Sequence, residues 1–175
     1  MKRRTLFLSS LALLSGCTAV HSPGTRERAG RLSLRAVGPK GAEAVTGRWK
    51  LVESKDLTEL TLMTPLYGIL ARITVTPEGA KLERPNKESE GAFDSAASAQ
   101  ELMQQHLGFG LPADMLSSWL SGEPWVQAPA QVTDDSFTQS GWQIAVRRRK
   151  PDGSPALVTL SQSTPRQITL TLVIE

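Results

Sequence analysis

The stretch 45–51, VTGRWKL, decides the fold, because its side chains alternate between two kinds. Positions 45, 47, 49 and 51 are apolar or small, and the positions between them are Thr, Arg and Lys. A period of two is that of a β-strand with one face in a core and the other in water. Outward from this stretch, further strands are expected at 32–36, 59–62, 71–76, 80–83, 142–146, 156–161 and 167–175, with a weaker one at 132–138. Turns such as 38–41, GPKG, separate them, which favours an antiparallel meander.

A helical period interrupts the strands between Ser95 and Gly122. Ser98 and Glu101 have the spacing of a capping box, and Gly108 is placed to end the helix that follows. A second helix is expected after Leu111-Pro112, with apolar residues at 115, 116, 119 and 120. The chain of 175 residues is about one domain in size. One strongly curved or closed sheet with two short helices packed on it accounts for all these segments.

The N-terminus has the features of a bacterial lipoprotein signal. Three cations at 2–4 precede the apolar segment 6–14, which is shorter than the roughly 20 residues that span a bilayer. The segment ends in Leu-Ser-Gly-Cys at 14–17, which resembles a lipobox, and Cys17 is the one cysteine of the chain. The resemblance implies cleavage before Cys17 and a diacylglyceryl group on its thiol. The alternatives are an ordinary signal peptide with a chance cysteine, or a cytosolic protein with an apolar start.

These features divide the chain into three parts. Residues 1–16 are expected to form the signal peptide, 17–28 a lipidated tether, and 29–175 the folded domain. Two or three acyl chains on Cys17 would make the attachment lasting, since each buried methylene contributes about 0.8 kcal/mol. Thr18, where an aspartate would signal retention in the inner membrane, favours the outer membrane. His21 lies in the tether and is expected to be solvated.

The charge and the chemical groups exclude several classes of function. The net charge of +3 equals the three cations at 2–4, so the remainder is neutral and unlike a general nucleic-acid binder. His21, His106 and one cysteine provide too few ligands for a zinc site, and no cofactor is expected. The chain lacks GxSxG, Walker, GxGxxG and HExxH motifs, and the adjacent Asp134 and Asp135 fit a turn better than a catalytic pair. An enzyme therefore has little support.

Two further groups allow two interpretations each. The run Arg147–Lys150 could be a solvated hairpin end, which is the favoured interpretation, or a docking patch for an acidic partner or an anionic lipid. The four tryptophans, at 49, 119, 125 and 142, could line an apolar ligand site or belong to the core.

The order of the motifs resembles the family of the outer-membrane lipoprotein receptor LolB. It runs from GRLSL at 30–34 through Trp49 and LTLMTPL at 60–66 to LPADMLSSWLSGEP at 111–124 and GWQI at 141–144. The Leu-Pro…Trp-Leu-x-Gly-x-Pro segment followed by Gly-Trp is the most specific part. The chain departs from the family pattern at Tyr67, which lengthens a Pro-Leu-Gly loop, at Arg147, where a tyrosine is usual, and in the last strand, which lacks a tryptophan.

The resemblance implies a mainly β fold: an incomplete antiparallel β-barrel with a short helical lid over an apolar cavity. LolB-like proteins accept lipoproteins from the periplasmic carrier LolA and insert them into the inner leaflet of the outer membrane; a monomer is expected. The acyl-binding cavity is expected to involve Leu34, Trp49, Leu62, Ile73, Met115, Trp119 and Ile144. The membrane-delivery loop is expected at Pro65, Leu66 and Tyr67, with the leucine projecting into solvent.

Three other hypotheses remain open. A lipoprotein of the same architecture could bind another apolar ligand, such as a lipid or glycolipid, as a sensor or scaffold. A transmembrane barrel is disfavoured by the helical stretch and by only eight aromatic residues after Phe7. An enzyme acting on cell-wall polymers comes third.

Overall fold

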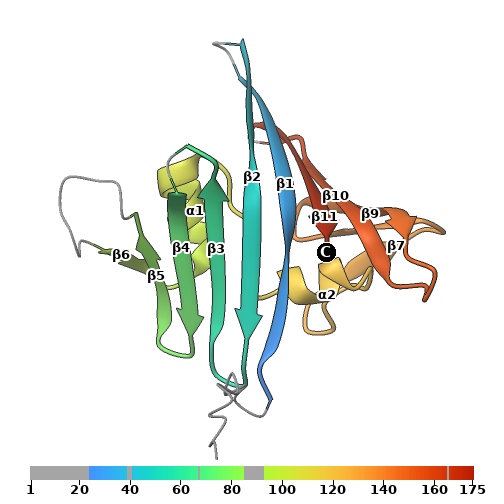
Figure 1. Cartoon of the computed structure of the whole chain (residues 1–175), viewed down its shortest axis with the longest axis horizontal. Coiled ribbons are helices and arrows are strands. Elements are labelled where there is room, and N and C mark those ends of the chain that lie inside the picture. The colour runs from blue at the N-terminus through green and yellow to red at the C-terminus, as the bar shows by residue number, and fades with distance from the viewer. Residues whose placement is uncertain (1–23, 39–40, 67, 85–92, 165) are drawn as a thin grey trace, which may run out of the picture.

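Antiparallel strands form one curved sheet, and two short helices lie against it (Figure 1). The computed structural model describes residues 24–38, 41–66, 68–84, 93–164 and 166–175. Within these residues the strands are β1 Arg26–Gly38, β2 Gly41–Glu53, β3 Thr58–Thr64, β4 Gly68–Thr76, β5 Gly79–Glu83, β6 Phe93–Ala96, β7 Ala130–Val132, β8 Ser136–Gln139, β9 Trp142–Arg149, β10 Pro155–Gln162 and β11 Gln167–Ile174. The helices are α1 Ala99–Leu107 and α2 Leu116–Leu120.

The sheet is an open one. Its order is β6-β5-β4-β3-β2-β1-β11-β10-β9-β8-β7, so the first and last strands of the chain pair in its middle and β6 and β7 form its edges. No ladder joins these two edges among the described residues. The predicted mainly β fold with an incompletely closed antiparallel sheet and short helices is confirmed.

The β1–β2 hairpin is longer than the alternation predicted. Its ladder runs without interruption from Arg26↔Glu53 to Gly38↔Gly41, so pairing continues past the apolar positions toward the turn. The hairpin projects beyond its neighbours at the end of the sheet where β3 turns into β4 (top of Figure 1). Since β1 starts at Arg26, the sheet includes the last three residues of the expected tether 17–28.

The helical region differs in part from the prediction. Ser98 caps α1 by accepting a hydrogen bond from the backbone N of Glu101 at 3.2 Å, and Gly108 ends the helix in the left-handed conformation, both as predicted. The expected start of the helical region at Ser95 is wrong, because Ser95 belongs to strand β6 and pairs with Lys81 of β5. The second helix is only five residues long. Among the described residues no helix is long and apolar enough to cross a membrane.

The two helices cover different halves of the concave face. Helix α1 packs against β4, β5 and β6, whereas α2 lies against the start of β1 and against β8. The middle of the sheet, at β1, β2, β3 and β11, faces the space between them. At Gly30, where β1 crosses this middle, an added Cβ would lie 1.8 Å from the carbonyl oxygen of Val173. Only glycine allows the two strands to approach this closely.

Candidate functional site

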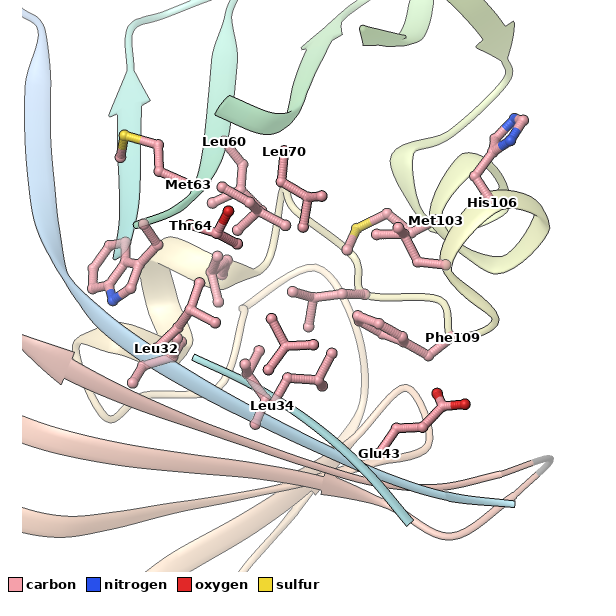
Figure 2. A pocket seen from close by; sticks show the side chains of 18 residues that line it. Leu32, Leu34, Glu43, Leu60, Met63, Thr64, Leu70, Met103, His106 and Phe109 are labelled. Carbon is pink, nitrogen blue, oxygen red and sulfur yellow. The ribbon is translucent and has the colours of Figure 1, made fainter. Parts of the chain in front are cut away.

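A cavity of about 300 Å³ lies between the middle of the sheet and the helices. Eighteen residues line it, and only Glu43, Thr64 and His106 of these are polar. The apolar lining is made of Leu32, Leu34, Val45, Trp49, Leu60, Leu62, Met63, Leu70, Met103, Leu107, Phe109, Leu111, Leu116, Leu170 and Leu172. Figure 2 shows Leu34, Leu60 and Leu70 directed toward the same central space, with His106 at the periphery on α1. Such a wall suits a hydrocarbon ligand and offers few groups for chemistry.

The cavity opens at the end of the sheet where β3 turns into β4. Eight of the eighteen lining residues are buried, whereas Val45 near the start of β2 and Leu70 near the start of β4 are each 40% exposed. Both lie at the hairpin end of their strands. An apolar side chain that is both cavity-lining and exposed marks the mouth.

Three of the seven predicted cavity residues, Leu34, Trp49 and Leu62, line this cavity. The other four do not appear in its lining: Ile73, Trp119 and Ile144 are fully buried in the core, and Met115 is half-buried against it.

The reason lies in the helices. Alternation predicts which face of a strand turns inward, and the strand residues among the seven do face inward. It does not predict which part of that face a helix covers. Ile73 lies on β4 in the half of the sheet that α1 covers, and Trp119 belongs to α2 itself. These side chains are packed in protein and leave no space for a ligand.

The sequence analysis missed the part of the wall that the helices and their connection provide. Met103 and Leu107 reach the cavity from α1, Phe109 and Leu111 from the connection, and Leu116 from α2. The helical spacing of Met103 and Leu107 was the available signal, since the apolar face of a lid must point into whatever it covers. Phe109 also contacts Trp142 edge-on, with ring centroids 6.4 Å apart.

Gln139 holds α2 and the segment after it in place. Its side chain is 1% exposed. Its Oε1 accepts hydrogen bonds from Trp119 Nε1 at 2.8 Å and from the backbone N of Trp125 at 2.9 Å. Its Nε2 donates to the carbonyl oxygens of Trp125 and Ala128, both at 2.8 Å. One buried amide thus forms four hydrogen bonds, which satisfy all of its own donors and acceptors.

Replacing Gln139 with leucine is therefore expected to lower the free energy of unfolding by about 3 kcal/mol, because buried polar partners are left unsatisfied. Urea denaturation would measure the change. Gln143→Leu is the matched control, since Gln143 is exposed on β9, and it should change stability by less than about 0.5 kcal/mol. Equal losses in the two variants would contradict the role assigned to Gln139.

Arg28 fastens α2 to the start of β1. Its guanidinium donates to the carbonyl oxygen of Ser117 at 2.9 Å and to Oγ of Ser121 at 2.8 Å. Oγ of Ser117 in turn donates to Glu53 at 2.6 Å. Partial burial lowers the pKa of Arg28, as does nearby Arg26, while Glu53 opposes the shift. The guanidinium stays charged, since an arginine side chain is effectively always protonated in a protein. A charged hydrogen-bond network thereby joins α2 to β1 and to the end of β2.

His106 has a structural contact at the edge of the cavity. Its Nε2 lies 3.3 Å from Oδ2 of Asp94 on β6, and the same oxygen accepts a hydrogen bond from Arg84 at 2.6 Å. The contact joins the last turn of α1 to the edge of the sheet. Within the described residues no group of His, Cys, Asp and Glu side chains could hold a metal ion.

The predicted delivery loop follows β3 at the mouth of the cavity. Pro65 is exposed, and Leu66 is 86% exposed. Tyr67, the third residue predicted there, lies outside the described residues, as does Cys17. Leu66 therefore presents an apolar side chain to solvent close to the exposed cavity residue Leu70.

Fold and cavity together define a class of protein: an open, lidded antiparallel half-barrel that encloses an apolar site and exposes a leucine at its mouth. The comparisons identify the family within this class. The family model described as "Outer membrane lipoprotein LolB" matches residues 26–175, so the chain belongs to the LolB family of outer-membrane lipoproteins.

Curated relatives agree with this assignment. The chain is 32% identical over 166 residues to the outer-membrane lipoprotein LolB of Cupriavidus metallidurans, with 91% of this chain and 78% of the relative covered. It is 27% identical to the LolB of Ectopseudomonas mendocina, with 100% of this chain and 96% of the relative covered.

A LolA superfamily protein from Nitrosomonas europaea is similar in structure, with a TM-score of 0.48, 8% identity, and 89% and 86% of the two chains covered.

Proposed function

We propose that this protein accepts lipoproteins from the periplasmic carrier LolA by taking their acyl chains into the cavity, and that it then inserts them into the inner leaflet of the outer membrane. Membership of the LolB family implies interaction with LolA and with client lipoproteins. The observation that carries the proposal is the apolar cavity whose mouth lies beside an exposed leucine. The role is one of binding and transfer, carried out by a monomer without a cofactor.

The free energy of hydration explains why a cavity is needed. Three acyl chains contain roughly 45 methylenes, and exposing them to water would cost tens of kcal/mol at about 0.8 kcal/mol each. Release into the periplasm is therefore excluded, and the chains must pass from one apolar site to another. The cavity has to bind them more tightly than the carrier does and less tightly than a bilayer.

The two helices are held to the sheet in different ways, and this difference indicates which of them can move when acyl chains enter. Helix α2 is fastened by Gln139 and Arg28, whereas α1 is held by apolar packing and by the contact of His106 with Asp94. We therefore assign the movement to α1, which would act as the lid.

Direct transfer tests the proposal. LolA loaded with a fluorescently labelled client lipoprotein would be mixed with a soluble form of this protein, and movement of the client to this protein would be followed by chromatography. We expect transfer without nucleotide. Failure to take up either the client or a free fatty-acyl probe would contradict the proposal. Mass spectrometry would identify any lipid or glycolipid that co-purifies instead, which would favour the sensor or scaffold hypothesis.

The anchor supplies a separate prediction. We propose that residues 1–16 are removed, that Cys17 carries the lipid, and that the segment after it tethers the domain to the membrane. Cys17→Ala, exported with an unrelated signal peptide, should move the protein from the outer-membrane fraction to the soluble periplasm. Ser22→Ala in the same segment is the control and should leave it in the membrane. A Cys17→Ala protein still firmly bound to the membrane would contradict this role.

A further inference from the structure

A shallow hollow lies on the outer face of the sheet, opposite the acyl cavity. Three arginines, Arg31, Arg48 and Arg148, line it, and the side chains of Leu157 and Val173 lie between them. The hydroxyl-bearing residues Ser33, Thr46 and Thr171 also belong to its lining. No lining residue is acidic in the part of the chain that the structure describes.

The strand register places these side chains in one row. Arg48 on β2 is opposite Arg31 on β1, and Arg31 is opposite Val173 on β11. Val173 is opposite Leu157 on β10, which is opposite Arg148 on β9. The row thus crosses five neighbouring strands, with cations toward both ends and apolar side chains between them. Guanidinium groups above an apolar floor match a lipid headgroup, which carries a phosphate above hydrocarbon.

The charges of the row are incompletely compensated. The side chains of Arg31 and Arg48 are 68% and 57% exposed, and Arg148 is exposed as well. Glu175 accepts a hydrogen bond from Arg48 at 2.7 Å and lies 3.7 Å from Nε of Arg31, so one carboxylate serves two guanidiniums. Like charges directly opposite on neighbouring strands lower stability. An external anion would relieve this repulsion.

The hollow continues to the delivery loop. Pro65 belongs to its lining and directly precedes the exposed Leu66. A membrane surface that Leu66 touches is therefore also within reach of the arginine row. Of the basic run Arg147–Lys150, Arg148 belongs to the row. Arg149 instead donates to the carbonyl oxygen of Gly153 at 3.0 Å in the turn that follows β9.

We infer that this hollow binds the phosphate groups of anionic phospholipids at the membrane surface, and so orients the protein while Leu66 touches the bilayer. The inference rests on the proposed function in one respect, that the Leu66 loop is the part that meets the membrane. Cations near an anionic leaflet are attracted over about a Debye length, and arginine binds phosphate with two parallel hydrogen bonds. Leu66 then provides apolar contact, and the arginines provide electrostatic attraction.

Vesicle binding tests the inference with residues 17–175 carrying Cys17→Ala, so that neither the signal peptide nor the lipid anchor masks the effect. Cosedimentation would be measured with phosphatidylcholine vesicles and with vesicles that also contain phosphatidylglycerol, at low and high salt. The test variant combines Arg31→Gln, Arg48→Gln and Arg148→Gln. The matched control removes three exposed cations elsewhere through Arg26→Gln, Lys55→Gln and Lys81→Gln.

We expect the test variant to lose about tenfold or more in affinity for phosphatidylglycerol vesicles at low salt, and the control less than about threefold. Glu175→Gln should bind these vesicles more tightly than the parent, because it frees two guanidiniums. Uptake of a client from LolA should be unchanged in all these variants.

Three results would overturn the inference: equal losses in the test and control variants, a loss that high salt does not reduce, or weaker vesicle binding by Glu175→Gln. Loss of uptake from LolA with vesicle binding intact would assign the hollow to an acidic protein surface instead. A parent protein that binds phosphatidylglycerol vesicles through the row yet takes up no client would contradict the proposed function and leave this inference standing.

Discussion

Leu34→Glu is expected to lower uptake of a client lipoprotein from LolA by about tenfold or more, because a carboxylate in an apolar wall must lose its hydration before an acyl chain can cover it. Leu34 is half-buried, lines the cavity from β1, and lies opposite Val45 on β2 and Leu170 on β11. It therefore lies in the middle of the wall and close to the mouth. The measurement is the rate and extent of transfer from the loaded carrier.

Two controls separate loss of ligand binding from loss of fold. Thr169→Glu introduces the same charge on β11 beside Leu170, on the outer face of the sheet where Thr169 lies opposite Arg35, and it should leave uptake unchanged. Leu34→Met keeps the volume and the apolar character and should also transfer normally. Urea denaturation would show whether Leu34→Glu still folds. A folded Leu34→Glu protein with normal uptake would show that acyl chains do not occupy this cavity.

The sheet could be predicted from the sequence because its strands are amphipathic. The longer strands have one face in the core and one in water where they cross the middle of the sheet, so alternation predicts both their existence and their inward side, as for Leu34 and Trp49. The short strand β6 could not be found in this way. Its four residues include the exposed Phe93, and the segment lies directly before the cap of α1. The helix signal there was stronger than the strand signal.

The cavity could be predicted only in part, because a cavity depends on what is missing between packed elements. Ile73 and Ile144 are as apolar as Leu62 and face the same side of the sheet. Whether space or a helix lies above such a residue depends on where the helices dock. In this chain, docking of α2 depends on Gln139 and Arg28, whose bonds join residues 11 to 93 positions apart. No local pattern in the sequence reveals those partners.

Leu66→Glu is expected to block delivery to the membrane while leaving uptake intact. The side chain is 86% exposed, so a charge there should change the free energy of unfolding by less than about 0.5 kcal/mol. Moving a leucine into the acyl boundary of a bilayer gains about 1.5–3 kcal/mol. This is enough for Leu66 to contact the bilayer reversibly while the client passes from the cavity into the membrane. A carboxylate loses this gain and is repelled by anionic lipids. Release of a labelled client from the loaded protein into liposomes should slow by about tenfold or more.

Val126→Glu is the matched control for this prediction, because Val126 is 93% exposed between α2 and β7 and receives the same charge. It should release its client at the parent rate. Leu66→Gln separates the loss of apolar contact from the added charge: slow release from liposomes of phosphatidylcholine alone would assign the effect to the lost contact. Normal delivery by Leu66→Glu, or unfolding of that variant, would make Leu66 a bystander or a packed residue. If Leu66→Glu slows release only into liposomes that contain phosphatidylglycerol, the introduced carboxylate acts by disturbing the arginine row beside Pro65.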